Sequence, residues 1–215
     1  MKLDVSSFRQ EEDSLDCGLV GLAMVYDYFG VDRGLGDIQE DLHITEGVGT
    51  YVPQLGIDLL NNGFDVEIVT LNPFLFTKND VGLGFDGVLN RFVSLKVDGG
   101  ADLKVLDFFI RFMKLGGKVT VRLPNLKDLK DELGAGRPVS AVLTTNFLYH
   151  DKPDFNFHYN LVTGVDDDFI YVNDPMWDER GGKNKYTIED FFYALYANAF
   201  GDVDNASLLK ARKKG

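Results

Sequence analysis

The first long apolar segment of the chain, from Cys17 to Phe29, predicts a helix. It contains no proline, and Gly30 stands where such a helix would end. Apolar residues fall on nearly every side of the segment, which is typical of a helix buried in a core. Asp13, Ser14 and Asp16 precede it and are residue types that cap helix N-termini, so we expect Cys17 to be the first helical residue.

The rest of the chain alternates between helical and strand patterns. A short helix is expected up to Leu42, with Asp37 as its N-terminal cap. Alternation of apolar and polar positions, together with glycine, proline and asparagine punctuation, indicates the remaining elements. The patterns predict helices over 52–62, 126–134 and 188–197, and strands over 64–71, 118–123, 139–143, 157–165, 169–173, 183–186 and 206–213.

Residues 74–117 are interpreted as a helical insert within a single domain that spans 1–215. Apolar residues recur there at helical spacing, and glycine pairs at 99–100 and 116–117 punctuate the segment. Such a stripe usually packs in a core. The alternative is that part of the stripe covers a substrate cleft. The stripe consists of Leu89, Phe92, Val93, Leu103, Leu106, Phe109, Ile110 and Met113.

Two motifs resemble ligand sites but lack the required context. Gly82 to Gly87 match the G-x-G-x-x-G pattern of dinucleotide-binding proteins, yet no strand pattern leads into them. Asp166 to Asp168 form an acidic turn between two predicted strands, without the ligand spacing of a calcium loop. We therefore expect neither a cofactor nor a metal ion.

Composition limits the classes of partner and the cellular compartment that we expect. The 215 residues carry a formal net charge of −12, which disfavours nucleic acid and anionic lipid as partners. One cysteine permits no internal disulfide, and with three histidines it cannot build a thiolate-rich zinc site. No signal sequence and no membrane-spanning run is found, so a cytoplasmic protein is expected. The oligomeric state stays open.

Cys17 is the strongest candidate for chemistry. A lone cysteine is ordinarily a small, inert hydrophobic residue. At the start of a helix, however, free backbone N–H groups and the positive end of the helix dipole favour a thiolate. The position of Cys17 therefore indicates a nucleophile, provided that a base lies close to it.

The predicted hairpin after residue 157 supplies that base. If the turn occupies 166–168, residues that face each other have numbers summing to about 334, so Asp174 lies opposite 159 or 160. His158 and Asp174 can then be close neighbours, given a small register change or a diagonal contact, and the carboxylate would orient the imidazole. His43, in or just after a short helix, and His150, in a loop, are weaker candidates.

Three ordered motifs resemble the papain-like C39 peptidase family. They are DCGLVGLAMVYDYFG at 16–30, GVGTYVPQLGIDLLNNGF at 47–64 and HYNLVTGVDDDFIYVNDP at 158–175, and the later GGKNKYTIEDFFYAL is similar to the family's closing segment. The resemblance implies a papain-like α+β fold with the nucleophile helix packed on an antiparallel sheet. It also implies Cys17 as nucleophile, His158 as general base and then acid, and Asp174 as the orienting residue.

In this family a glutamine just before the cysteine usually completes the oxyanion hole. The candidate is Gln10, which lies one position farther upstream than the family pattern, where Glu11 stands. Family members that cleave double-glycine leaders typically precede the membrane and nucleotide-binding domains of an exporter. This sequence shows neither, so we expect a stand-alone member.

The leading hypothesis is a thiol hydrolase that cleaves a peptide or other amide bond through an acyl-enzyme. The expected partner is a peptide or protein substrate, but the sequence does not identify it. A papain-like binding module without activity, and an acyltransferase of the same fold, remain as alternatives.

Overall fold

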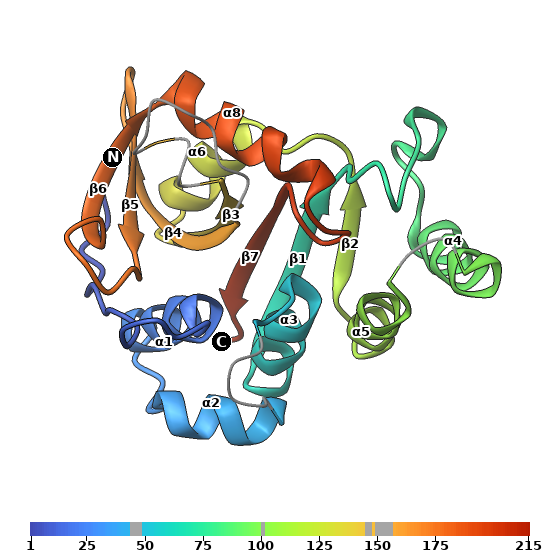
Figure 1. The fold of residues 1–215 in the computed structure, drawn as a ribbon, viewed down its shortest axis with the longest axis horizontal. Coiled ribbons are helices and arrows are strands. Elements are labelled where there is room, and N and C mark those ends of the chain that lie inside the picture. Colours follow the sequence, from blue (N-terminus) through green and yellow to red (C-terminus); the bar gives the residue numbers. More distant parts are fainter. Residues whose placement is uncertain (44–48, 100–101, 145–147, 149–156) are drawn as a thin grey trace.

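The computed structural model describes residues 1–43, 49–99, 102–144, 148 and 157–215. Within these residues, seven strands form one sheet in the order β2-β1-β7-β3-β4-β5-β6 (Figure 1). Neighbouring strands are antiparallel except β1 and β2, which pair in parallel. The strands are β1 (Phe64–Thr70), β2 (Lys118–Val121), β3 (Val139–Leu143), β4 (His158–Val165), β5 (Phe169–Asp174), β6 (Gly182–Thr187) and β7 (Ser207–Lys213).

Helices cover both faces of this sheet and make the fold α+β, as the sequence predicted. The α-helices are α1 (Cys17–Tyr28), α2 (Leu35–Leu42), α3 (Val52–Asn61), α4 (Phe85–Asp98), α5 (Leu103–Lys114), α6 (Leu126–Gly134) and α8 (Ile188–Ala197). Two short 3-10 helices are η1 (Lys78–Asp80) and η2 (Asn198–Phe200). In the described part of the chain, no helix is long and apolar enough to cross a membrane.

Most predicted elements lie where the patterns indicated, and α6 and β3 agree with their predicted bounds to the residue. The prediction that Asp37 caps α2 was wrong. Gly34 occupies the cap position, and the Asp37 carboxylate instead accepts a hydrogen bond from the Gly34 N–H at 2.9 Å. An acidic residue in the third helical position commonly makes this contact.

Alternating side chains of the central strands divide the interior into two cores. Leu161 and Leu209 point towards a core shared with α1 and α3, whereas Val162 and Leu208 point towards a core shared with α6 and α8. Figure 1 shows α1 to α3 on one side of the sheet and α8 on the other. The helix that begins at Cys17 therefore packs against the sheet and contacts β4 directly.

The C-terminal strand β7 lies in the middle of the sheet, between β1 and β3. Its Lys210 is buried and donates to Asp128 Oδ1 at 2.6 Å, and Arg122 pairs with the same carboxylate at 2.5 Å. A buried lysine needs such a partner because desolvation of an unpaired charge is costly. Asp128 and Lys210 are buried and Arg122 is partly exposed, and together they form a charge cluster that links α6 to the sheet.

The segment interpreted as an insert forms α4 and α5. These helices contact each other, α5 packs on α3, and α4 contacts β2. Phe92 and Phe109 of the predicted stripe are buried and stack at 4.9 Å between ring centroids. Val93 and Leu103 were expected in the same stripe but are about half exposed, at 47% and 48%. Both lie outside the contact between the two helices.

Candidate active site

Cys17, His158 and Asp174 each stand at an end of a regular element. Cys17 is the first residue of α1, His158 the first of β4, and Asp174 the last of β5. Asp16 occupies the N-cap position of α1 without accepting a side-chain hydrogen bond there. The positive end of α1 is therefore left facing the thiol rather than a capping carboxylate.

The hairpin has the register that the sequence predicted. Leu161 pairs with Asn173, whose numbers sum to 334, and the register shifts by one residue beyond Val162. Continuing the pairing places Asp174 opposite position 160, diagonal to His158. His158 Nε2 lies 2.7 Å from Asp174 Oδ1, and both side chains are buried. The Met176 N–H donates to the same oxygen at 2.8 Å and helps to hold the carboxylate in place.

Cys17 lies beside this pair. Its side chain is partly exposed, and Sγ accepts hydrogen bonds from the His158 ring and from the backbone N–H groups of Gly18 and Tyr159. Because Nε2 faces Asp174, the ring nitrogen left for the sulfur is Nδ1. The structure thus brings together the thiol, the imidazole and the carboxylate that the sequence singled out.

The electrostatics of the pair favour separated charges. Burial raises the pKa of Cys17, but the positive charge and hydrogen bond of His158 and the two backbone N–H groups lower this pKa more strongly. Burial likewise lowers the pKa of His158, but the Cys17 charge and the hydrogen bond to Asp174 raise it to about 10. A thiolate and an imidazolium therefore coexist between the lowered pKa of Cys17 and about pH 10.

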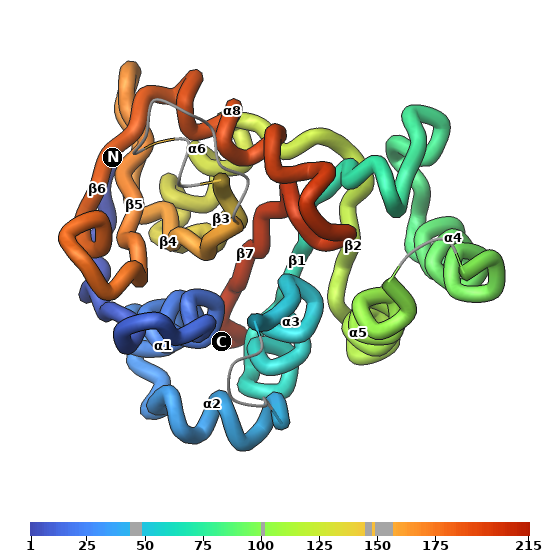
Figure 2. Tube along the Cα trace, in the orientation of Figure 1, coloured from blue at the N-terminus to red at the C-terminus, as the bar shows by residue number. Residues whose placement is uncertain are grey.

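Gln10 reaches this site through the N-terminal segment. That segment runs beside the hairpin: Leu3 N–H donates to Thr163 O at 2.7 Å, and Gln10 N–H donates to Pro175 O at 2.8 Å. Figure 2 shows the blue N-terminal segment beside β5 and β6. Gln10 Nε2 donates to Ser14 O at 2.6 Å, and the residue lines the same cavity as Cys17. The extra residue before the cysteine therefore does not remove Gln10 from the site.

The cavity measures about 600 Å³. None of the described residues that line it belongs to 74–117, so the alternative of a roof formed by that segment was wrong. The cavity is lined by Gln10, Asp13, Ser14, Leu15, Cys17, Gly49, Thr50, Phe157, His158, Tyr159, Met176, Trp177 and Arg180.

Sequence reasoning missed several of these lining residues. Thr50 Oγ1 and Tyr159 Oη are buried without a hydrogen-bond partner among the described residues, and Gln10 Oε1 is in the same condition. Burial and the nearby Asp204 raise the pKa of Tyr159, so its hydroxyl stays protonated. Thr50 belongs to the second of the three motifs and Tyr159 follows His158, yet neither spacing nor hydropathy marks their hydroxyls.

Other predicted candidates lie elsewhere. His43 ends α2 in a left-handed conformation and does not line the cavity, and His150 lies outside the described residues. The acidic turn is closed by Asp166, whose Oδ1 accepts from Phe169 N–H at 2.7 Å. In the glycine pattern at 82–87, α4 already begins at Phe85. Where the chain is described, no three histidine, cysteine or acidic side chains gather as metal ligands would.

Comparisons with known proteins bear on the family and the fold. Residues 112–202 match the model of the Peptidase_C39 like family. This region contains His158 and Asp174, whereas Gln10 and Cys17 precede it. The match confirms the family resemblance that the sequence motifs indicated. No curated protein sequence matches the chain significantly.

Two solved structures have a similar fold. One is a presumed C39-like peptidase from Bacillus anthracis, with a TM-score of 0.50 and 17% identity over 100% of this chain and 99% of that one. The other is the peptidase domain of Streptococcus ComA, a bifunctional ABC transporter involved in a quorum-sensing pathway. It has a TM-score of 0.49 and 13% identity over 98% of this chain and 99% of that one. The first likeness confirms the papain-like fold.

Proposed function

We propose that this chain, whose residues 112–202 match the model of the Peptidase_C39 like family, is a cysteine peptidase that cleaves a peptide or other amide bond. One observation carries the proposal. Cys17 Sγ is hydrogen-bonded to His158, and the far nitrogen of that imidazole lies 2.7 Å from Asp174 on the wall of a cavity. A nucleophile, a base and an orienting group in this order are the requirement for thiol-based acyl transfer.

In the proposed reaction, the Cys17 thiolate attacks the carbonyl carbon and His158 holds the proton on Nδ1. The tetrahedral intermediate collapses when His158 gives this proton to the leaving amine, and an acyl-enzyme remains. Water, deprotonated by the same imidazole, then attacks the thioester and releases the acid. Asp174 stays ionised and keeps Nε2 protonated, so Nδ1 is the nitrogen that exchanges protons.

Two groups are proposed to stabilise the oxyanion. The Cys17 N–H belongs to the first turn of α1, where backbone N–H groups have no intrahelical acceptor. Gln10 Nε2 carries two protons, of which one is used by Ser14 O and the second can point into the cavity. Donors fixed before the reaction stabilise the developing charge without reorganisation.

The apolar residues of the cavity support a peptide as the substrate. Leu15 and Phe157 line the cavity and are exposed and apolar, which suits the side chains of an extended peptide.

The test is cleavage profiling with a peptide library, followed by mass spectrometry. We expect cleavage by the wild-type protein and none by Cys17→Ala, with an unchanged unfolding temperature because Cys17 is partly exposed. Cleavage that persists in Cys17→Ala would refute the assignment. Addition of small amines separates hydrolysis from acyl transfer, since a transferase yields the amide of the added amine.

A further inference from the structure

Helix α4 carries a second apolar face that the described residues leave largely exposed. Phe85, Leu89, Val93 and Val97 follow one another at four-residue spacing and form what we call the α4 stripe. Phe85, Val93 and Val97 are 50%, 47% and 82% exposed, and Leu89 is partly buried. An adjacent face of the same helix is already used in the core.

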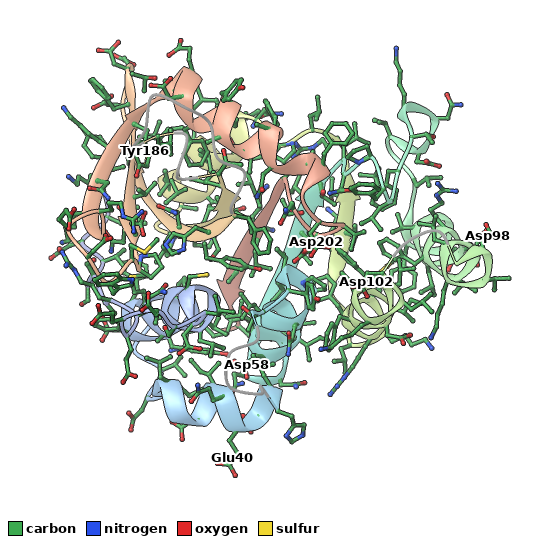
Figure 3. All side chains as sticks on the ribbon, in the orientation of Figure 1. Glu40, Asp58, Asp98, Asp102, Tyr186 and Asp202 are labelled. Carbon is green, nitrogen blue, oxygen red and sulfur yellow. The ribbon has the colours of Figure 1, made fainter. Side chains whose placement is uncertain are left out.

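That adjacent face accounts for the folding of α4. Val88, Phe92 and Leu95 are buried, and α4 contacts α5 and β2. A helix that is apolar on two faces normally lies inside a protein, whereas α4 lies at the margin of the molecule in Figure 1. Asp98, at its C-terminal end, marks the same outer margin in Figure 3. The intramolecular packing therefore does not explain the α4 stripe.

We propose that the α4 stripe is a dimer interface in which α4 packs antiparallel on α4 of a second copy of this chain. Contiguous exposed apolar surface of this kind is a mark of protein interaction sites. In a two-fold arrangement centred at the level of residue 91, Phe85 meets Val97 of the second copy and Leu89 meets Val93 of the second copy. Both contacts occur twice, as two-fold symmetry requires.

Charge favours this occupant over an unrelated partner. Asp86 and Lys96 flank the α4 stripe, each five residues from position 91 and on opposite sides of it. In the antiparallel arrangement, Asp86 stands level with Lys96 of the second copy, so unlike charges meet at both ends. In a parallel arrangement in register, like charges would meet instead. The net charge of −12 on each copy opposes association by long-range repulsion. Salt at about 0.15 M screens this repulsion.

The interface is small, because a helix of 14 residues is only about 21 Å long. We therefore expect a concentration-dependent dimer with a dissociation constant in the range of about 1–100 μM. Sedimentation equilibrium of the full chain at about 1–200 μM should give a mass that rises from that of one copy towards that of two. A monomer over this whole range overturns the proposal.

Substitution at the α4 stripe tests the surface. The double variant Val93→Glu/Val97→Glu should weaken association by at least about tenfold, because four carboxylates would be placed in the interface. Leu115→Glu is the matched control, since Leu115 is an equally exposed apolar residue beyond the end of α5. Equal association of the wild-type protein and the double variant overturns the proposal. All these positions are exposed, and unfolding temperatures verify that the variants fold.

Charge reversal tests the antiparallel arrangement. Asp86→Lys should weaken association because two lysines then meet at each end, and Asp86→Asn should weaken it less. Lys96 is left unchanged because it pairs with Asp107 within its own chain. Equal association of the wild-type protein and Asp86→Lys overturns the arrangement. The outcome does not depend on peptidase activity.

Discussion

The pairing of Cys17 with His158 predicts an unusual pH dependence of thiol alkylation. The perturbation is His158→Ala. In the wild-type protein the imidazolium lowers the pKa of Cys17, so the thiolate persists as the pH falls below the range of an ordinary thiol. Without His158, burial raises this pKa and only the N–H groups of Gly18 and Tyr159 oppose it. The pH at which alkylation becomes fast should therefore move upwards.

The magnitude follows from the ionised fraction. A thiol with the ordinary pKa of 9.0 is ionised in about one molecule in a thousand at pH 6. A thiolate held by His158 is present in a much larger fraction, but each unit by which its pKa is lowered also reduces its nucleophilicity about threefold. The net expectation is alkylation of Cys17 about 10- to 100-fold faster than that of a free thiol at pH 6.

The assay is the rate of iodoacetamide modification of Cys17 by mass spectrometry between pH 5 and pH 10. His158→Ala should lose most of the 10- to 100-fold advantage at pH 6. His43→Ala is the matched control, because His43 lies at the end of α2 and does not line the cavity. Equal rates for the wild-type protein and His158→Ala at pH 6 would show that no ion pair forms, and would favour an inert binding module.

Five further variants, at four positions, test other parts of the structure. Asp174→Ala should lower kcat by about 100-fold with little change in KM, and Asp174→Asn should retain more activity because its amide oxygen still accepts from the imidazole. Equal losses in both variants would contradict an orienting role. Gly18→Ala should destabilise the fold by about 1–3 kcal/mol and lower activity, since its Cβ would lie 2.1 Å from Thr50 Oγ1. Gly21→Ala, with no atom within 4 Å of the added carbon, should instead stabilise by about 0.5–1 kcal/mol in thermal unfolding. The pKa of Asp128 is lowered from 3.8 to about 2 in the folded protein, so its contribution of about 2 kcal/mol is present above pH 4 and is lost as the pH falls towards 2. Asp128→Asn should remove this part of the acid sensitivity and destabilise the protein at pH 7, as measured by urea unfolding.

Local patterns were sufficient for most elements because helices and strands follow from neighbouring residues. The apolar run after Cys17 determined α1, and two strands around an acidic turn determined the hairpin. The turn set the register to within one residue, and an irregularity after Val162 shifts it to the predicted sum of 334 near His158. The closeness of His158 and Asp174 was therefore predictable without coordinates, but the exact pairing was not.

Contacts between segments distant in sequence were not predictable in this way. The position of β7 between β1 and β3 depends on how all strands share two cores, and no local signal in 206–213 indicates a central strand. The exposure of the α4 stripe is another example, since periodicity does not tell which of two apolar faces the fold covers. Resemblance to a family, rather than spacing, pointed to Gln10, and only the pairing of the N-terminal segment with the hairpin brings it to the cavity.

The sequence by itself determined the reactive residue types, their place at the ends of helix and strands, and the partner of the imidazole. Those features depend on helix capping, side-chain alternation and turn length, which are properties of short segments. Only the tertiary structure decided that α1 meets β4, that Nδ1 is the nitrogen next to the sulfur, and that Thr50 and Tyr159 line the same cavity. These depend on the packing of the whole domain, in which each contact is set by the burial of apolar side chains far away along the chain.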